Sequence, residues 1–339
     1  MKTAVITGPR QVRIENRPTP HASGDFVVVK ITVAPMCTEY KLYRDGYPSD
    51  MLGHEAAGEV VDVAQPGRVK VGDRVVVMPQ YPCGRCGYCL SGDYIYCQNN
   101  IDPLVATGNT TGTATYVQYV LKQDWLLIPL PEDISTEHGS MACCGLGPTF
   151  GAMQRMDVNA FDTVLITGAG PVGLGGVVNG VFRGARVIVV EPNPFRRQMA
   201  MELGAVAAVD PNDPSALQQI LDLTAGKGVD KGVECAGTPE AQRLLVDAVR
   251  RRGQIAFVAE AGSFTLHISN DLLRKGLVVH GIWHWNLADT PRMLQVIRSC
   301  GNLLSRMITH RFPLTRVQEA WELQLTGNCG KVILYPWQE

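Results

Sequence analysis

The sequence predicts an α/β protein of two domains, in which a β-rich half precedes a half built on a parallel, doubly wound sheet. Three observations support this prediction: the length of 339 residues, a change of pattern near residue 160, and a glycine-rich turn between an apolar strand and a helix. At roughly 100–200 residues per domain, this length suggests two domains.

The first part of the chain is rich in short runs with strand character. Glycine, proline and aspartate separate these runs, as they do in a region of short strands. Examples are residues 26–33, 59–63, 74–78 and 115–121. We therefore predict a β-rich domain over residues 1–152.

From about residue 160, apolar strands alternate with segments of helical length. This alternation is typical of βαβ units on a parallel sheet, and it predicts a second domain over residues 153–287. The strands are expected at 163–167, 185–191, 232–235, 254–259 and 278–282, with a helix over 239–251. The remaining residues, 288–339, predict helices at 291–300 and 315–326 and a closing strand at 331–335.

Composition and charge narrow the classes of partner and location. The net charge of −1 gives no general attraction to nucleic acid or to an anionic membrane. No apolar stretch approaches the ~18 residues of a membrane helix, and residues 1–6 lack the pattern of a signal peptide. We expect a cytoplasmic protein that binds neither nucleic acid nor membrane.

Four of the ten cysteines are spaced C-x2-C-x2-C-x7-C in a lobe at about residues 80–100: Cys83, Cys86, Cys89 and Cys97. A reducing compartment disfavours disulfides. Zinc prefers four tetrahedral ligands, and four thiolates close a structural site. Iron–sulfur clusters also use four cysteines, but the surrounding chain resembles neither class of small electron carrier. The spacing predicts a structural zinc site.

A G-x-G-x-x-G turn, Gly168 to Gly173, follows the apolar strand at 164–166 and opens an apolar helix. Gly168 permits the tight turn, Gly170 lets a pyrophosphate approach the backbone, and Gly173 permits close contact of helix and strand. Pro171 and Val172 lie at the helix N-terminus, which faces the phosphates. The segment therefore predicts a dinucleotide-binding site.

An acidic residue, Glu191, ends the next predicted strand about 20 residues later, where a carboxylate accepts hydrogen bonds from a ribose hydroxyl. The same carboxylate repels a 2′-phosphate, so NAD is favoured over NADP. Arg196 and Arg197 follow and weaken this preference slightly. We expect one of them, with Arg196 as the choice, to line the adenine pocket.

A second set of metal-binding residue types is dispersed along the chain. Cys37 lies alone in the β-rich part, His54 and Glu55 follow, and Cys143 and Cys144 precede the glycine-rich half. Taken singly, each is equally consistent with a buried structural residue. Together they offer the two thiolates and one imidazole of an open catalytic zinc site. Spacing alone leaves both interpretations open.

With these motifs in place, the chain resembles the zinc-containing medium-chain dehydrogenase/reductase family, the alcohol and polyol dehydrogenases. The resemblance extends over essentially the whole chain. It rests on Cys37, residues 53–60, the cysteine lobe, and residues 113–120, 168–173, 191, 233–237, 308–314 and 330–332. It implies a GroES-like catalytic domain with an inserted Rossmann domain, a C-terminal segment that rejoins the catalytic domain, and a homodimer or homotetramer.

The resemblance also implies roles for individual residues. Cys37 and His54 match the catalytic zinc ligands, and Glu55 matches an acidic neighbour that can exchange onto the metal. The Cys144-Gly145 pair aligns with the family's Cys-Gly turn, so Cys144 is the expected third ligand and Cys143 the alternative.

One segment departs from the family. After the first ligand the family commonly reads Cys-Gly-Ser/Thr-Asp-x-His, whereas this chain reads Cys37-Thr38-Glu39-Tyr40-Lys41 and is one residue shorter there. Thr38 then matches the hydroxyl of the proton relay, Glu39 the neighbouring carboxylate, and Lys41 replaces the relay histidine.

The implied function is hydride transfer from an alcohol or polyol carbon to NAD, with one catalytic and one structural zinc per chain. A zinc-independent quinone or enone reductase of the same superfamily lacks these ligands. The other alternative is a non-catalytic NAD-binding protein. The altered segment after Cys37, where the family has its proton relay, is compatible with this alternative. No motif in the sequence identifies the substrate.

Overall fold

The computed structural model describes residues 1–339, which form two compact units. The first unit comprises residues 1–143, 286–301 and 308–339, and the second comprises residues 144–285 and 302–307. The first unit therefore contains both termini, and most of the last 50 residues belong to it.

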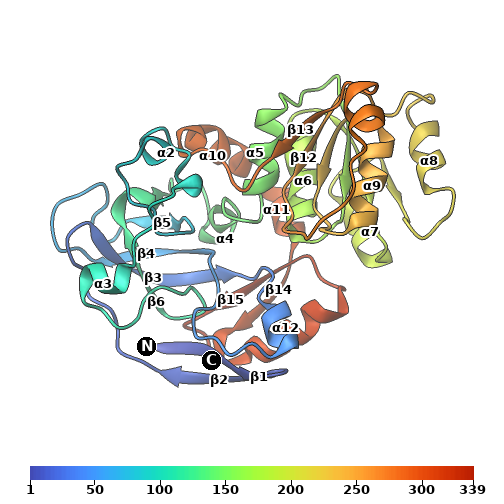
Figure 1. Cartoon of the computed structure of the whole chain (residues 1–339). Coiled ribbons are helices and arrows are strands. Elements are labelled where there is room, and N and C mark those ends of the chain that lie inside the picture. The colour runs from blue at the N-terminus through green and yellow to red at the C-terminus, as the bar shows by residue number, and fades with distance from the viewer. The chain divides into compact units, whose positions relative to one another are not determined.

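The first unit is built on a sheet with strand order β14-β15-β3-β4-β5-β7, in which β6 also pairs with β3 (Figure 1). Neighbouring strands are antiparallel except β14 and β15, which are parallel. A separate hairpin joins β1 and β2. The strands are β1 Lys2–Gly8, β2 Gln11–Asn16, β3 Phe26–Pro35, β4 Ala56–Asp62, β5 Arg74–Val77, β6 Tyr119–Gln123, β7 Leu127–Pro129, β14 Ile308–Pro313 and β15 Lys331–Tyr335.

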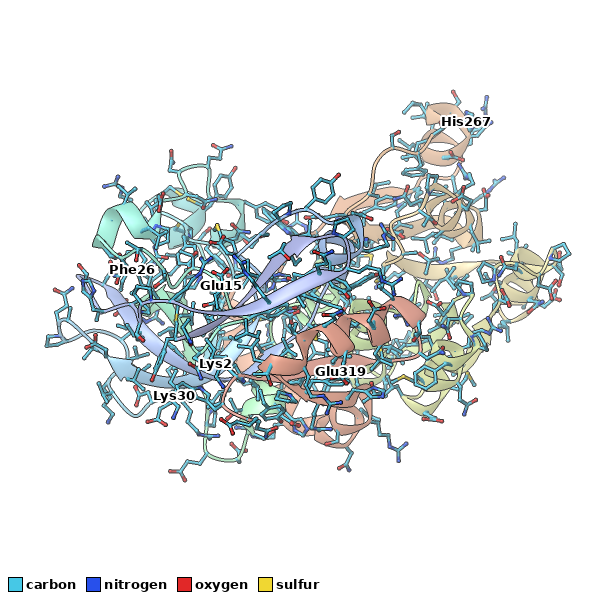
Figure 2. All side chains as sticks on the ribbon, turned by 90° about the horizontal axis from the view of Figure 1, so that it is seen from below. Lys2, Glu15, Phe26, Lys30, His267 and Glu319 are labelled. Carbon is cyan, nitrogen blue, oxygen red and sulfur yellow. The ribbon has the colours of Figure 1, made fainter.

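Short helices fill the connections of the first unit. They are α1 Tyr40–Asp45, α2 Gly87–Leu90, α3 Pro103–Thr107, α4 Thr136–Ser140, α10 Thr290–Ser299 and α12 Val317–Thr326, with 3₁₀ turns at η1 Tyr94–Tyr96, η2 Asp124–Leu126, η4 Leu287–Asp289 and η5 Leu314–Arg316. Helix α12, which carries Glu319, contacts strand β2 of the hairpin (Figure 2). Its Trp321 is fully buried in the core of this unit.

The second unit has a parallel sheet with strand order β10-β9-β8-β11-β12-β13. The order reverses between β8 and β11, as in the doubly wound dinucleotide-binding fold. The strands are β8 Thr163–Thr167, β9 Arg186–Val190, β10 Ala207–Val209, β11 Val229–Glu234, β12 Val249–Phe257 and β13 Val278–Gly281. The predicted fold class, a GroES-like β-rich domain with a Rossmann domain, is confirmed.

Helices cover both faces of the parallel sheet (Figure 1). Helix α6 packs on α5 and α7, whereas α8 and α9 pack together against β10 and β11. The helices are α5 Gly147–Arg155, α6 Pro171–Phe182, α7 Pro194–Glu202, α8 Ala216–Asp222, α9 Pro239–Ala248 and the π-helix η3 Ile268–Leu273. Helix α11, Gly301–Met307, spans a boundary of the two units. No helix of the chain combines the length and apolar character needed to cross a membrane.

The bounds of several predicted elements differ from the structure, and two of them show why. The strand expected at 115–121 begins only at Tyr119, because Val117 makes an isolated bridge to Thr3 instead. The helix expected at 239–251 ends at Ala248, because Val249 turns into extended backbone and pairs with Val229 of β11. Pairing with a neighbouring strand thus overrides the helical pattern of the local sequence.

Candidate zinc sites and nucleotide-binding turn

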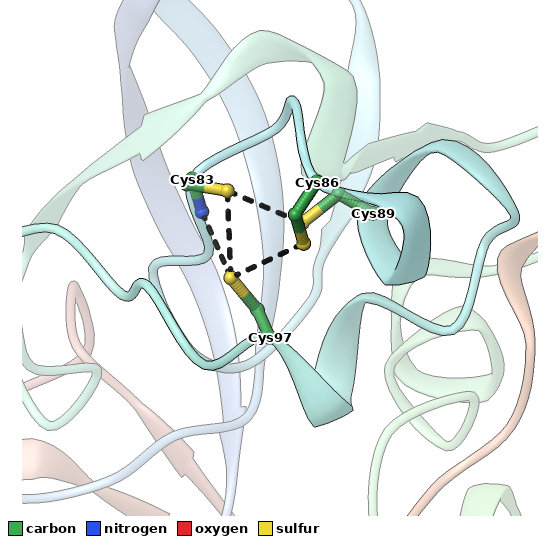
Figure 3. A group of neighbouring side chains, drawn as sticks. All are labelled: Cys83, Cys86, Cys89 and Cys97. Atoms are coloured by element: carbon green, nitrogen blue, oxygen red, sulfur yellow. Dashed lines mark hydrogen bonds between the residues drawn. The ribbon is translucent and has the colours of Figure 1, made fainter.

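The four lobe cysteines converge on one point (Figure 3). Four of their Sγ–Sγ distances lie between 3.5 and 3.9 Å. A tetrahedral zinc ion with Zn–S bonds of ~2.3 Å separates its sulfurs by about 3.8 Å. All four cysteines are free thiols rather than disulfides. The donor set therefore fits a structural zinc ion.

Backbone groups prepare this lobe for thiolate ligands. N–H groups of Arg85 and Cys86 lower the pKa of Cys83 to about 6, although burial opposes the shift. The N–H groups of Cys83 and Asn99 each lie 3.4 Å from Sγ of Cys97 and donate to it. Such donors stabilise negative sulfur, which is the form that binds a metal.

Strand β6 fixes the chain where it enters the lobe. The buried Lys122 donates from Nζ to the carbonyl of Gln80 at 2.7 Å and lies 3.7 Å above the ring of Tyr81. The buried Gln123 donates from Nε2 to the carbonyl of Pro82 at 2.6 Å. Two consecutive side chains of one strand thus donate hydrogen bonds to backbone carbonyls that shortly precede Cys83 in the sequence.

Replacing Cys86 by serine is expected to leave about one zinc per chain instead of two, because the lobe loses one of its four ligands. We expect the free energy of unfolding to fall by about 4 kcal/mol, in the range of mutations that remove a metal. Zinc analysis and denaturant unfolding measure both effects. Cys300→Ser is the control, since Cys300 is buried outside both metal groups; equal zinc content in the two variants would contradict the assignment.

The second candidate site contains Cys37, His54, Glu55 and Cys144, whose ligand atoms all lie within 4.8 Å of one another. Strand β3 leads to Cys37, and strand β4 begins directly after Glu55. Because β3 and β4 pair with Val33 opposite Ala57, the end of one strand lies beside the start of the other. This pairing brings Cys37 together with His54 and Glu55.

The two adjacent cysteines differ in their surroundings. Cys143, the last residue of the first unit, is fully buried and donates from Sγ to the carbonyl of Val77 at 3.3 Å. Burial raises the pKa of this thiol, so it stays protonated. Cys144, joined to it by the peptide bond, contributes its sulfur to the ligand group. The geometry favours Cys144 over Cys143 as the third ligand.

His54 is oriented by the carboxylate of Glu39, which lies 2.8 Å from its Nδ1. Burial alone raises the pKa of Glu39, but the bonds and charge of His54 lower it to about 2, so the carboxylate is ionised. Burial lowers the pKa of His54, but Cys37 and Glu39 raise it well above its usual value. The same negative groups favour a cation bound at this site.

Glu55 forms a completely buried ion pair with Lys331, whose Nζ donates to Oε1 at 2.6 Å. Burial, which outweighs the attraction of Lys331, raises the pKa of Glu55 to about 7. Its second oxygen, Oε2, is buried without a hydrogen-bond partner. A buried, unpaired carboxylate oxygen within a group of thiol and imidazole ligands is a position that a cation would satisfy.

The contact of Lys331 with Glu55 was not predicted, although residues 330–332 belong to the segments that carry the family resemblance. Lys331 begins β15, which pairs with the end of β3 through Ile333 opposite Pro35. A separation of 276 positions from Glu55 leaves no local signal in the sequence.

The two predicted relay residues are exposed. Thr38 follows Cys37, and Lys41 lies on α1, whose first turn closes with a bond from the Lys41 N–H to the Thr38 carbonyl. Their role in proton transfer stays a prediction.

In the second unit, the glycine-rich turn connects β8 to α6. Gly168 has φ +86°, and a Cβ at Gly173 would lie 1.8 Å from the Gly168 carbonyl oxygen. A Cβ at Gly170, in contrast, would meet no atom within 4 Å, so this backbone borders open space. Pro171 and Val172 form the first turn of the 12-residue helix α6. The turn therefore fits a pyrophosphate at a helix N-terminus.

Glu191 ties this turn to the end of β9. Its Oε2 accepts the N–H of Ala169 at 2.7 Å, and its Oε1 accepts the N–H of Asn193 at 2.9 Å. Arg197 pairs with Asp210 at 3.0 Å, whereas the N–H of the half-buried Arg196, in the first turn of α7, donates to Oδ1 of Asn193 at 3.3 Å. The ribose and adenine roles of Glu191 and Arg196 stay predictions.

Comparisons with known proteins agree with this geometry. The family described as "Alcohol dehydrogenase GroES-like domain" matches residues 23–132, and "Zinc-binding dehydrogenase" matches residues 171–299. Sorbitol dehydrogenase of Bacillus subtilis is 30% identical over 99% of this chain and 97% of its own. The chain belongs to the zinc-containing medium-chain alcohol dehydrogenase family. Its predicted membership and its class as an oxidoreductase are confirmed.

Two further proteins are similar to this chain over nearly its whole length. L-threonine 3-dehydrogenase of Pyrococcus horikoshii is 30% identical over 98% of this chain and 97% of its own. The crystal structure of 2R,3R-butanediol dehydrogenase from Bacillus subtilis is 26% identical, covers 99% of both chains and superposes with a TM-score of 0.84. The compounds in these names, sorbitol, threonine and butanediol, each carry a hydroxyl group.

Proposed function

We propose that this chain oxidises a secondary alcohol carbon and that its substrate is a polyol. The hydride acceptor is NAD, and each chain holds two zinc ions. The observation that carries the proposal is the group Cys37, His54, Glu55 and Cys144, whose ligand atoms lie within 4.8 Å of one another. The relatives named for sorbitol, threonine and butanediol support a substrate with more than one polar group. A zinc-independent reductase would not require such a group of metal ligands.

Cys37, His54 and Cys144 would hold the catalytic zinc, with Glu55 beside it, and the lobe cysteines would hold the structural zinc. A bound zinc ion supplies Lewis acidity, which lowers the pKa of an alcohol hydroxyl. Glu39 fixes the His54 ring through Nδ1 and so leaves Nε2 as the ligand nitrogen. Thr38 and Lys41, both exposed, are the residues proposed to carry the released proton to solvent.

The second unit would bind NAD through the turn Gly168–Gly173. Backbone N–H groups at the start of α6 bind the pyrophosphate, and the open space at Gly170 admits it. Glu191 would accept a hydrogen bond from a ribose hydroxyl, and Arg196 would line the adenine pocket. NAD itself carries the redox chemistry, and the protein orients it.

Replacing Glu191 by glutamine is expected to lower kcat/KM for NAD by about 10- to 100-fold, since a hydrogen bond to a charged group contributes ~1.5–3 kcal/mol. We expect kcat/KM for NADP to change little or to rise, because the repelling carboxylate is gone. Steady-state kinetics with both cofactors measure the ratio. Glu202→Gln, on the exposed end of α7, is the control; an unchanged ratio in Glu191→Gln would contradict the role.

We also propose that the chain forms a homodimer or homotetramer and that it is located in the cytoplasm. Strand β13 is an edge of the parallel sheet, and its Val278 and Val279 are 47% and 39% exposed. An exposed edge strand with apolar side chains is a ready surface for a second copy of the chain. Sedimentation of the wild type against Val279→Lys tests this surface; a monomeric wild type would contradict it.

The substrate class is tested by NAD reduction with a panel of polyols, amino alcohols and simple secondary alcohols. We expect the highest kcat/KM with a compound that carries a second hydroxyl beside the reacting carbon. Primary monohydric alcohols are the comparison set, and a preference for them would overturn the proposed polyol specificity.

A further inference from the structure

Tyr116, which precedes strand β6 in the sequence, is fully buried in the first unit. Its hydroxyl donates to Oε2 of Glu39 at 2.8 Å. The same hydroxyl accepts the N–H of Cys37 at 3.3 Å, and that N–H also lies 3.2 Å from Oε2 of Glu39. One phenol oxygen thus connects a candidate metal ligand to the carboxylate that orients another.

The ring of Tyr116 also determines the backbone before His54. Gly53 has φ +82°, and a Cβ there would lie 2.4 Å from Cδ1 of Tyr116 and 2.3 Å from Oγ1 of Thr115. The chain can approach the ring this closely only because residue 53 has no side chain. Tyr116 is therefore in contact with the segments that carry Cys37 and His54.

The ring of Tyr116 packs against helix α12. Trp321 of helix α12 lies 6.1 Å from Tyr116 between ring centroids. Gln324, one turn later, donates from Nε2 to the carbonyl of Cys37 at 3.2 Å. Helix α12 thus supports both the ring and the Cys37 backbone, so Tyr116 has little freedom to shift.

We propose that Tyr116 is a positioning residue that holds Cys37 directly, and His54 through Glu39, in the arrangement that binds a divalent cation. This inference rests on the proposed function, since it concerns the same metal group. Glu39 reaches His54 with Oε1 and Tyr116 with Oε2, so its carboxylate is fixed at both oxygens. Without the hydroxyl, the carboxylate and the imidazole could rotate, and the ligands would have to be reordered on binding.

The test is the dissociation constant of zinc at this group in Tyr116→Phe, measured by competition with a chelator. Loss of a group that is hydrogen-bonded to a metal-binding histidine typically costs about 10- to 100-fold in metal affinity. Tyr116 bonds to that group, Glu39, and to the N–H of Cys37 rather than to the histidine, so we expect the lower end of the range, about 10-fold. Occupancy of the lobe, resolved as the second zinc per chain, should not change. Phenylalanine retains the ring, so the packing against Gly53 and Trp321 is preserved.

Tyr43→Phe is the matched control. Its hydroxyl donates to Glu322 at 2.7 Å, and its ring stacks on the same Trp321, with centroids 4.9 Å apart. It therefore loses a tyrosine–glutamate bond in the same aromatic cluster, but away from the metal group. Because Glu322 is 37% exposed, we expect a smaller loss of stability in Tyr43→Phe than in Tyr116→Phe, and loss of zinc affinity in Tyr116→Phe alone.

A double-mutant cycle with Glu39→Gln tests the route of the effect. If Tyr116 acts through Glu39, the combined loss of zinc affinity should be clearly smaller than the product of the single losses. Zinc affinity in Tyr116→Phe within twofold of the wild type, or equal to that of Tyr43→Phe, would overturn the inference and leave the proposed function standing. A wild type that binds zinc at the lobe alone would overturn both.

Discussion

Replacing Cys144 by serine should remove the catalytic zinc and lower kcat/KM by about 10³-fold, because Lewis-acid catalysis contributes several kcal/mol to the transition state. The sulfur of Cys144 lies in the candidate ligand group, whereas the neighbouring Cys143 donates to the carbonyl of Val77. Cys143→Ser should therefore retain two zinc ions per chain and activity close to the wild type.

The two adjacent variants are each other's control, since they make the same chemical change one residue apart. Zinc content and kcat/KM with the best substrate of the panel measure the difference. The reverse outcome, full activity in Cys144→Ser and loss in Cys143→Ser, would assign the third ligand to Cys143. Full activity in both would remove the thiolates from the mechanism.

The second large effect is expected at the glycine-rich turn. A Cβ at Gly173 would overlap the Gly168 carbonyl oxygen at 1.8 Å, and neither backbone can yield without opening the contact of α6 with β8. We expect Gly173→Ala to lower the free energy of unfolding by about 1–3 kcal/mol or more. NAD binding should be lost with it, because the turn that presents the N–H groups is displaced.

Gly170→Ala separates the two roles of this turn. A Cβ at Gly170 meets no protein atom within 4 Å, so the melting temperature should stay that of the wild type. The methyl group would instead occupy the space proposed for the pyrophosphate, and we expect the dissociation constant for NAD to rise about tenfold or more, at ~1.4 kcal/mol per factor of ten. Calorimetry and NAD titration of both variants measure this; unchanged NAD affinity in Gly170→Ala would place the cofactor elsewhere.

The local geometry that the sequence predicted best belongs to residues that lie close together along the chain. The four lobe cysteines lie within residues 83–97, and the glycine-rich turn lies between strand β8 and helix α6. In both, local spacing determines the geometry, because the connecting backbone is too short to separate the groups.

The features that the sequence did not predict depend on distant pairings. Glu55 meets Lys331 because β15 returns to pair with β3. Tyr116 meets Glu39 because β6, which follows Tyr116, pairs antiparallel with β3, which precedes Glu39. Spacing could not separate Cys143 from Cys144 either, since the choice depends on which side chain is turned to the carbonyl of Val77. Similarly, strand pairing at Val249 ended a helix that the local pattern extended to residue 251.

The central claim is that zinc at Cys37, His54 and Cys144 is required for transfer of a hydride from an alcohol to NAD. Its most direct test is the rate of NAD reduction after the catalytic zinc is removed by a chelator under conditions that leave the lobe zinc in place, and again after zinc is restored. We predict loss of activity on removal and recovery on restoration, with one zinc per chain lost and regained. Undiminished NAD reduction by protein that retains only the lobe zinc would contradict the claim.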